Sequence, residues 1–512
     1  MNKYNQLKIG SFLSYTQMAL NIIIQLIYTP IMIRLLGKNE YGLYQTVAST
    51  ISMLSLLSLG FNSGYIRYYA IYAKESRKDL ISKLNGLFLI IFAVIGFVGL
   101  LCGLYLSFNL SLIFDQGLTS SEYSTAQILM LLLTFSLAVS FPMSVFQNII
   151  SAHEQFIVLK LLGMVKTVFS PLITLPLLLI GYRSIAMVSV TVSVSLFVDI
   201  MYLLYVIIKM KEKFVFHDFE KGIFKGLLIY TVFIAFNTVI DQINWNIDKL
   251  LLGRFKGTAE VAVYSVGFTL YQCYMMFSTS ISGVFTPRIH KIVNATKDNP
   301  IEQKKQLTEL FTKVGRIQFL ILGLIASGIA FFGKYFITGI WAGEGYDNSY
   351  YVALLLVIPA SIALIQNLGI EIQRAENKHQ FRSIAYAFMA LFNLGLSIVL
   401  CQRYGAIGSA IGTAISLIVA NGFIMNVYYN SKCNIDIFVF WKNILRQSVG
   451  ILFPICIGII MVLFIEINSI LVFCLCAIVY VAVYCISMWF LGMNNYEKEL
   501  VKKPIFKIFH RN

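Results

Sequence analysis

The sequence is a succession of long apolar stretches separated by short polar ones. A helix needs about 20 mostly apolar residues to cross a bilayer, and fourteen stretches reach that length. They are residues 10–33, 42–66, 84–106, 124–150, 157–180, 185–208, 226–252, 258–286, 314–338, 350–372, 384–401, 407–429, 447–466 and 470–492. Only 12% of the 512 residues are charged, whereas soluble proteins carry about 25%. The pattern predicts an all-α integral membrane protein with about fourteen transmembrane helices.

Lysine and arginine are distributed unevenly between alternate loops. With the N-terminus inside, the inner segments hold 31 basic residues and the outer loops hold 7. Because cytoplasmic loops carry the excess of positive charge, this bias predicts that both termini are cytoplasmic. The net charge of +16 is spread along these loops, as topology and anionic lipid headgroups favour. We therefore expect membrane lipids, and no nucleic acid, as partners.

Two halves of the chain resemble one another. Three pairs of segments match in the same order and at a nearly constant separation along the chain. The pairs are 34–47 with 249–267, 151–156 with 375–381, and 181–193 with 404–416. A unit with an even number of spans re-enters from the same side, so the repeats are parallel and a substrate site is expected between them. We predict an N-lobe over 1–215, a C-lobe over 216–430, and two added helices with a basic cytoplasmic tail over 431–512.

The seventh predicted span, residues 226–252, carries a polar stripe. Helical spacing places four of its side chains on one face, namely Asn237, Asp241, Asn244 and Asp248. Gln242, Asn246 and Lys249 are expected to widen that face. An Asp or Lys at the centre of a span costs about 2.5–3.5 kcal/mol to insert. Asp241 lies about 22 Å from the cytoplasmic end, at 1.5 Å per residue. We therefore exclude a lipid-facing position for Asp241 and predict contact with water or a partner.

The first predicted span carries a similar stripe. Gln17, Asn21, Gln25 and Tyr28 share one face. The register that pairs Asn21 with Asn237 also pairs Gln25 with Asp241 and Tyr28 with Asn244. Equivalent helices with polar faces fit two walls of one water-filled cleft. The predicted cavity-lining residues are Gln17, Asn21, Gln25, Tyr28, Asn237 and Asn244.

Three intramembrane carboxylates are candidates for ion coupling. Asp241 is the first, because a carboxylate in a semi-apolar cleft can bind and release H⁺ or coordinate Na⁺. A hydrogen-bonded structural aspartate is the alternative. Asp248 shares the face of Asp241. Asp199 and Lys166 lie mid-span on consecutive helices. In one interpretation they form a structural ion pair that holds the two helices together. In the other, Lys166 faces the cleft and its positive charge binds an anionic substrate.

Other basic residues are candidates for binding an anion. Arg67 and Arg288 end equivalent spans near the cytoplasmic face, either as topology anchors or flanking the inner mouth of the cleft. Arg34, with Arg254 and Lys256, lies at the outer ends, where it either receives phosphate or caps a helix C-terminus. Lys249 is either an interfacial anchor or functional.

No catalytic constellation is recognisable in the sequence. It contains no P-loop, no nucleotide-binding fingerprint and no Ser/His/Asp arrangement at an aqueous face. We expect no catalytic residue and no metal site, and a transporter rather than an enzyme. A polymerase or ligase would need a sizeable outer loop, and the longest ones, near 107–123 and 339–349, are short. A channel would not need such a repeat.

Three segments resemble those of bacterial polysaccharide exporters. They are "RLLGKNEYGLYQTVASTISMLSLLSLGFNSGYIRYYA" (34–70), "NIDKLLLGRFKGTAEVAVYSVG" (246–267) and "TPRIHK" (286–291). The chain is thus similar to the polysaccharide and oligosaccharidyl-lipid flippases of the multidrug/oligosaccharidyl-lipid/polysaccharide (MOP) superfamily. Their fold is MATE-like, with two six-helix lobes and, in these relatives, two further C-terminal helices.

This resemblance implies a function. The expected cargo is an undecaprenyl-pyrophosphate-linked oligosaccharide for O-antigen, capsule or exopolysaccharide, flipped outward across the bacterial cytoplasmic membrane. Alternating access would be driven by an H⁺ or Na⁺ gradient, without a cofactor. Basic cavity residues would hold the pyrophosphate, and the candidates here are Arg34, Arg67, Lys166, Lys249 and Arg288. A polysaccharide polymerase and chain-length machinery are implied partners. A lipid II flippase and a multidrug exporter are the alternatives within the superfamily.

Overall fold

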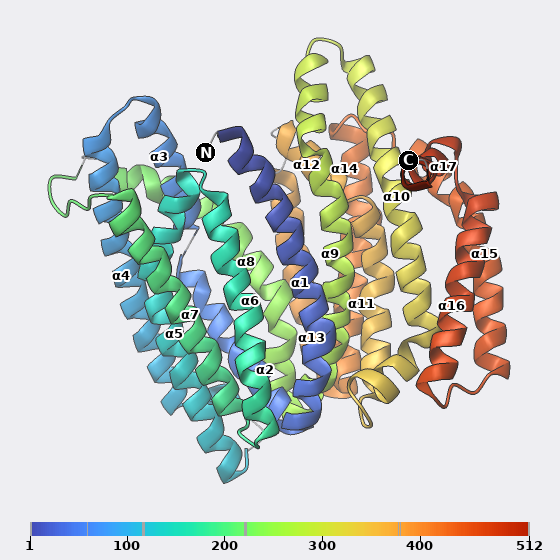
Figure 1. Ribbon diagram of the computed structural model, residues 1–512, viewed down its shortest axis with the longest axis horizontal. Helices are drawn as coiled ribbons and strands as arrows, with labels where there is room; N and C mark the ends of the chain where they lie inside the picture. Colours follow the sequence, from blue (N-terminus) through green and yellow to red (C-terminus); the bar gives the residue numbers. More distant parts are fainter. Residues whose placement is uncertain are drawn as a thin grey trace. The chain divides into compact units, whose positions relative to one another are not determined.

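The fold is helical throughout the part of the chain that the structure describes. The computed structural model describes residues 3–58, 60–114, 118–219, 223–376, 378 and 380–509. Within these ranges it consists of helices and turns, with no β-strand (Figure 1). This confirms the predicted all-α class, because long apolar segments satisfy their backbone hydrogen bonds within a helix.

The chain divides into two compact units. Unit 1 comprises Met1–Ser265 and Ser397–Ser409, and unit 2 comprises Val266–Leu396 and Ala410–Asn512. These units are defined by contacts, whereas the predicted lobes at 1–215 and 216–430 are defined by the sequence repeat. In particular, α8, which opens the predicted C-lobe, packs on α2 within unit 1. The boundaries of the lobes stay a prediction.

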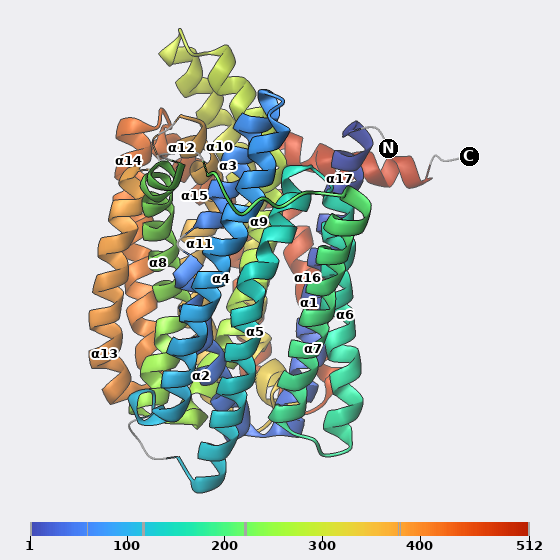
Figure 2. The ribbon, with the colours of Figure 1, turned by 90° about the vertical axis from the view of Figure 1, so that its left-hand side faces the viewer.

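Unit 1 holds the two helices with polar stripes, α1 and α8. Its elements are α1 (Lys3–Leu36), α2 (Lys38–Leu54), η1 (Ser55–Ser58), α3 (Phe61–Lys74), α4 (Lys78–Phe108), η2 (Leu110–Leu112), α5 (Ser120–Ala152), α6 (Phe156–Leu179), α7 (Ser184–Leu204), η3 (Tyr205–Met210), α8 (Ile223–Phe255) and the start of α9 (Thr258–Ala295). Helix α4 runs along α5, and α1 runs along α6 (Figure 2). Buried aromatic rings, among them Phe61, Tyr65 and Phe88, join α3 to α4 in the core.

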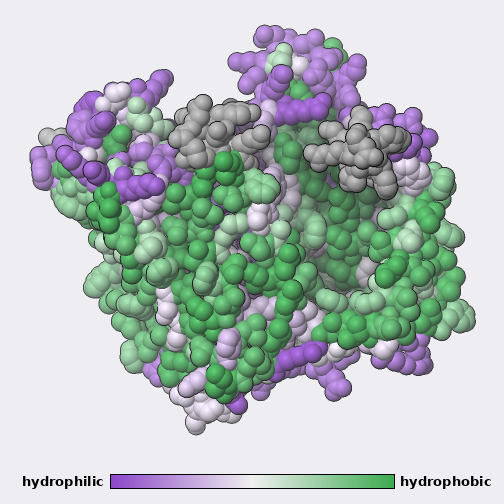
Figure 3. Space-filling model, in the orientation of Figure 1, coloured by the Kyte–Doolittle hydropathy of each residue, from purple (hydrophilic) through white to green (hydrophobic). Residues whose placement is uncertain are grey.

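Unit 2 is arranged around the long helix α10. Its elements are the rest of α9, α10 (Pro300–Tyr335), η4 (Phe336–Trp341), α11 (Asp347–Ile365), α12 (Leu368–Ala375), α13 (Gln380–Leu417, apart from 397–409), η5 (Ile418–Ile424), α14 (Met425–Lys432), α15 (Ile437–Phe464), α16 (Ile470–Ser487), η6 (Met488–Gly492) and α17 (Asn495–Phe509). Helix α10 packs against α11 and α15. The hairpin of α9 and α10 projects beyond the other helices of unit 2, and its tip is hydrophilic (Figures 1 and 3).

Eleven helical stretches among the described residues are long and apolar enough to cross a membrane. One of them, 380–432, has 53 residues. It is interrupted by Gly405, whose φ of 58° and ψ of −135° break α13 between the predicted spans 384–401 and 407–429. Helices α8 and α9 lie outside these eleven and coincide with the predicted spans 226–252 and 258–286. Hydrophobic side chains cover the middle of the visible face (Figure 3). The chain is a multi-pass membrane protein, and the count of fourteen spans stays a prediction.

Candidate functional site

The candidate site is the polar surface of α8 in unit 1. Asp241 lies close to the middle of this helix, which runs from Ile223 to Phe255. It is exposed, and its stripe neighbours Asn237 and Asn244 are half-buried. A mid-helix carboxylate that the protein does not cover meets the geometric requirement for exchanging an ion with water.

Asp248, the last residue of the stripe, is held differently. It is 2% exposed. Its two carboxylate oxygens accept hydrogen bonds from the Tyr264 hydroxyl of α9 at 2.7 Å and from the Ser409 hydroxyl of α13 at 2.7 Å. A buried carboxylate with both oxygens satisfied costs far less than an unpaired one. The geometry therefore gives Asp248 a role in joining three helical segments of unit 1.

A second polar face of α8 packs on α2 and on η1, the short helix that directly follows α2. The Gln242 amide donates to Ser55 Oγ at 3.1 Å, and the Asn246 amide donates to Gln242 Oε1 at 2.5 Å. Lys249 Nζ donates to Gln45 Oε1 at 3.1 Å. Each of these three positions on α8 lies at least about 80° around the helix from the nearest residue of the Asp241 stripe, at 100° per residue. They form the contact with α2 and η1, and the expectation that they widen the stripe is wrong.

The stripe of α1 faces α6. Gln17 is half-buried, and its amide lies where a Cβ at Gly163 of α6 would meet it. The Tyr28 side chain lies near that of Thr174, also on α6. Asn21 and Gln25 are half-buried as well. The two stripes therefore differ in surroundings, since the α1 stripe is partly used for packing on α6.

Two contacts in unit 1 match one another in the two repeats, and we call each of them a corner. In both, a glutamate in the first turn of one helix bonds a backbone N–H of another helix. At the first corner, Glu40 in the first turn of α2 accepts from the backbone N–H of Ser184, at the start of α7, at 2.8 Å. At the second corner, Glu260 in the first turn of α9 accepts from the backbone N–H of Ala406, in α13, at 2.7 Å. Sequence reasoning missed both carboxylates. The signal was a Glu placed three positions after a glycine in each repeat.

The corners also revise the alignment of the two stripes. Gly37 (φ 79°) precedes α2 and Gly257 (φ 84°) precedes α9, and the register that pairs these glycines also pairs the two glutamates. This register replaces the one that paired Asn21 with Asn237. It matches Asp241 with Asn21 and Asp248 with Tyr28. The matched pairs put a carboxylate in the second repeat where the first has an amide or a phenol.

The structure places the remaining predicted residues as follows. Asp199 on α7 is buried, accepts from the Gln147 amide at 3.1 Å, and interacts electrostatically with Lys166 on α6. Lys166 is exposed, as are Arg34 in the last turn of α1 and Arg67 on α3. Arg288 is exposed on α9 in unit 2. Their role as a pyrophosphate site stays a prediction. Among the described residues, no group of three or more His, Cys, Asp or Glu side chains could hold a metal ion.

Comparisons with known proteins identify the class and then the family. The fold is similar to that of the lipid II flippase MurJ in an inward closed conformation, with a TM-score of 0.70 at 14% identity, covering 96% of this chain and 99% of that one. It is also similar to an inward-facing multidrug resistance MATE family transporter of the MOP superfamily, with a TM-score of 0.64 at 14% identity, covering 84% and 99%. The fold is thus that of MOP superfamily transporters and flippases, as predicted. Residues 8–293 match the polysaccharide biosynthesis protein family, and the chain belongs to that family.

Two relatives agree with this placement. An uncharacterized membrane protein of Methanocaldococcus jannaschii is 24% identical over 492 residues, which are 91% of this chain and 92% of the relative. The capsular polysaccharide biosynthesis protein CapF of Staphylococcus aureus is 23% identical over 213 residues, 41% of this chain and 50% of CapF.

Proposed function

We propose that this protein flips an undecaprenyl-pyrophosphate-linked oligosaccharide across the bacterial cytoplasmic membrane, from the inner to the outer leaflet, by alternating access. Membership of the polysaccharide biosynthesis family and the flippase fold support a lipid-linked saccharide as the cargo. The positive-inside bias supports cytoplasmic termini. In this proposal the protein is a transporter and not an enzyme.

The observation that carries the mechanism is the exposed carboxylate of Asp241 at the middle of α8. A protein retains an ionisable group at that depth only where water or a partner reaches it. We assign Asp241 to the binding and release of H⁺ or Na⁺ during the cycle. Asp248, with both oxygens already bonded, serves to hold α8 to α9 and α13.

The test is a pair of chromosomal replacements, Asp241→Asn and Asp248→Asn, in a strain whose surface glycan depends on this gene. We expect Asp241→Asn to reach wild-type amounts in the membrane and to abolish the glycan. Asp248→Asn should lower the amount of protein instead, because it weakens charge-assisted bonds worth about 1.5–3 kcal/mol. Normal glycan with Asp241→Asn would remove Asp241 from coupling.

A second measurement tests the wet stripe. In a background with the native cysteines replaced, Gln25→Cys and Asn244→Cys should react with a water-soluble maleimide, and Leu227→Cys, at a fully buried position of α8, should not. Failure of both stripe positions to react would contradict a water-filled path. Accumulation of lipid II in the deletion strain, with normal surface polysaccharide, would instead favour the lipid II flippase.

A further inference from the structure

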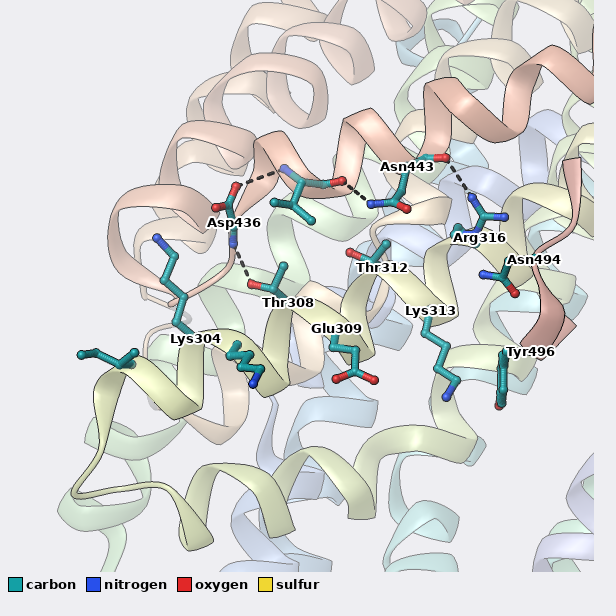
Figure 4. Close-up of a pocket in the computed structure, with 13 residues that line it drawn as sticks. Lys304, Thr308, Glu309, Thr312, Lys313, Arg316, Asp436, Asn443, Asn494 and Tyr496 are labelled. Carbon is teal, nitrogen blue, oxygen red and sulfur yellow. Dashed lines mark hydrogen bonds between the residues drawn. The ribbon is translucent and has the colours of Figure 1, made fainter.

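A pocket in unit 2 is lined by none of the residues assigned above. It has a volume of about 660 Å³ and lies among α10, α15 and the start of α17 (Figure 4). Lys304, Lys305 and Lys313 of α10 line it, together with the amides of Asn443 and Asn494. The tip of the α9–α10 hairpin, where two of these lysines lie, belongs to the segments predicted to be cytoplasmic.

One residue of the lining, Arg316, belongs to a buried ion pair. Arg316, 5% exposed, donates from Nε to Glu497 Oε1 at 2.6 Å and from Nη2 to Glu497 Oε2 at 2.9 Å. It also donates to the backbone carbonyls of Asn443 and Gly492 at 3.0 and 2.9 Å. Four of the five N–H groups of the guanidinium thus donate hydrogen bonds, and the pair with Glu497 is bidentate. Arg316 therefore fixes the first turn of α17 against α10 and α15, and its own charge is neutralised.

The positive charge available to a ligand comes from the lysines. Lys304 and Lys305 are exposed, and Lys313 is half-buried with its Nζ 3.5 Å from the centroid of the Tyr496 ring. Two acidic residues also line the pocket. Asp436 is the N-cap of α15, and its Oδ1 accepts a hydrogen bond from the backbone N–H of Val439. Glu309 is exposed and offsets part of the charge. The pocket remains net positive, which favours an anion.

The surroundings of the pocket are those of a membrane interface. Two apolar residues of its lining are exposed, Ile301 at 84% and Val439 at 44%. Along α15, which is one of the candidate spans, this exposed apolar face continues through Phe453, Ile460 and Phe464, which lie within about 60° of Val439 around the helix at 100° per residue. Trp489 lies about one turn before α17, with the ammonium groups of Lys498 and Lys502 5.9 and 5.8 Å from its ring centroid. Aromatic and basic side chains together are typical of the headgroup level.

We propose that this pocket binds the phosphate headgroup of an anionic glycerophospholipid, with the acyl chains lying along the exposed apolar face of α15. Lys304, Lys305 and Lys313 contact the phosphate, and Asn443 and Asn494 supply neutral hydrogen bonds to it or to the glycerol. The lipid bound here is a resident lipid and not the transported cargo. The proposal of this site therefore does not depend on the proposed transport function.

The test compares two triple variants of the full-length protein in detergent. Lys304→Gln, Lys305→Gln and Lys313→Gln remove the three lysine charges from the pocket. Lys209→Gln, Lys211→Gln and Lys213→Gln remove the same charge from exposed positions after α7. Native mass spectrometry during titration with dioleoylphosphatidylglycerol gives the apparent Kd for the first lipid bound, and dioleoylphosphatidylcholine serves as the zwitterionic comparison.

We expect the pocket variant to bind phosphatidylglycerol at least about fivefold more weakly than the wild type, because each lysine near an anionic headgroup contributes about 1 kcal/mol. The control variant should bind like the wild type, and phosphatidylcholine should show no difference among the three. Equal weakening in both variants, or none in either, would overturn the proposal. Displacement of the lipid by millimolar inorganic phosphate would overturn the lipid assignment in favour of a soluble phosphate ligand.

Discussion

The first and second corners of unit 1 make the same contact in two different ways. At the first, the carboxylate of Glu40 bonds the backbone N–H of Ser184 and also accepts from its hydroxyl at 2.6 Å, with Arg183 at 3.4 Å from the other oxygen. At the second, Glu260 bonds the backbone N–H of Ala406, whose side chain has no hydroxyl. What the two repeats share is a carboxylate at a helix N-terminus, where backbone donors and the helix dipole both favour negative charge.

The difference lies in the residue that makes room for the carboxylate. At the second corner, a Cβ on Gly405 would lie 2.4 Å from Glu260 Oε2. At the first, the residue directly before the bonded N–H is Arg183 (φ −89°), and the nearby glycine, Gly181 (φ 99°), lies three residues before Ser184 and has nothing within 4 Å of such a Cβ. The first corner is secured by additional side-chain bonds, and the second by close approach to a glycine. A repeat can therefore preserve a contact while its neighbouring residues diverge.

The largest effect is expected from Gly405→Ala. Its backbone conformation (φ 58°, ψ −135°) costs a residue with a Cβ about 1–3 kcal/mol. The new methyl group also displaces the Glu260 carboxylate, for about 1–2 kcal/mol more. We expect the free energy of unfolding in mixed micelles to fall by about 3 kcal/mol in total.

Gly181→Ala is the control for this variant, because Gly181 also has a positive φ but makes no close approach to a carboxylate. It should lose only about 1–2 kcal/mol, for the left-handed backbone. Equal losses for the two glycine variants would break the comparison, because the close approach at the second corner would then contribute nothing.

The next effect concerns the carboxylates themselves. Glu40→Ala removes a bond to a backbone N–H and a bond to a hydroxyl, and we expect a loss of about 2–3 kcal/mol. Glu260→Ala removes the bond to Ala406, for a loss of about 1–2 kcal/mol. Arg183 is 75% exposed, so its ion pair adds little and neither loss should depend on salt. Chemical unfolding at low and high ionic strength measures both, and a larger loss for Glu260→Ala would reverse the ranking.

The smallest expected effect is a pH dependence of stability at the turn between α5 and α6. This turn, unlike the two corners, is stabilised by a histidine. His153 Nε2 lies 3.0 Å from Glu212 Oε1. Burial by itself lowers the pKa of His153, but its bonds to Glu212 and to the Ile149 carbonyl outweigh burial and leave the pKa raised above its ordinary value. The stabilisation is thus fully present below about pH 6.5 and is lost as pH rises through the raised pKa.

Wild-type stability should therefore fall slightly on going from weakly acidic to weakly alkaline pH, and His153→Gln should remove that dependence. The corner variants Glu40→Ala and Glu260→Ala, which leave His153 in place, should retain it. Thermal unfolding followed by intrinsic fluorescence across this pH range provides the measurement, and a slope that survives in His153→Gln would rule out His153 as its source.

The positions of the helices could be predicted because the bilayer dictates the length of an apolar segment. Each of the fourteen predicted ranges falls mostly on described helical residues, and the break predicted between 401 and 407 contains Gly405. The alignment of the repeats was less accurate. Sequence similarity matched the first glycine after each polar stripe, Gly37 with Gly253, whereas the backbone matches Gly37 with Gly257. In the backbone register, α1 and α8 begin at equivalent positions and end within one residue of each other, so the alignment from sequence similarity was shifted by about one turn.

The surroundings of the candidate site could be predicted only in part. Helical periodicity alone places Asp241 and Asn244 on one face and predicts that Asp241 avoids lipid. It does not reveal which helix covers the neighbouring face, so Gln242, Asn246 and Lys249 were assigned to the stripe when they form the contact with α2 and η1. Partners such as Ser409, far along the chain from Asp248, follow from tertiary structure that no local pattern encodes.

The bonds of Asp248 have a consequence for biosynthesis. Tyr264 leaves the ribosome shortly after Asp248, but Ser409 follows much later in the chain. At about 5–20 residues per second, the nascent chain waits about 8–30 s for that second hydroxyl. During this interval the half-satisfied carboxylate must remain near the insertion channel or borrow another donor. The late arrival of one serine thereby sets the earliest moment at which this part of the membrane domain can close.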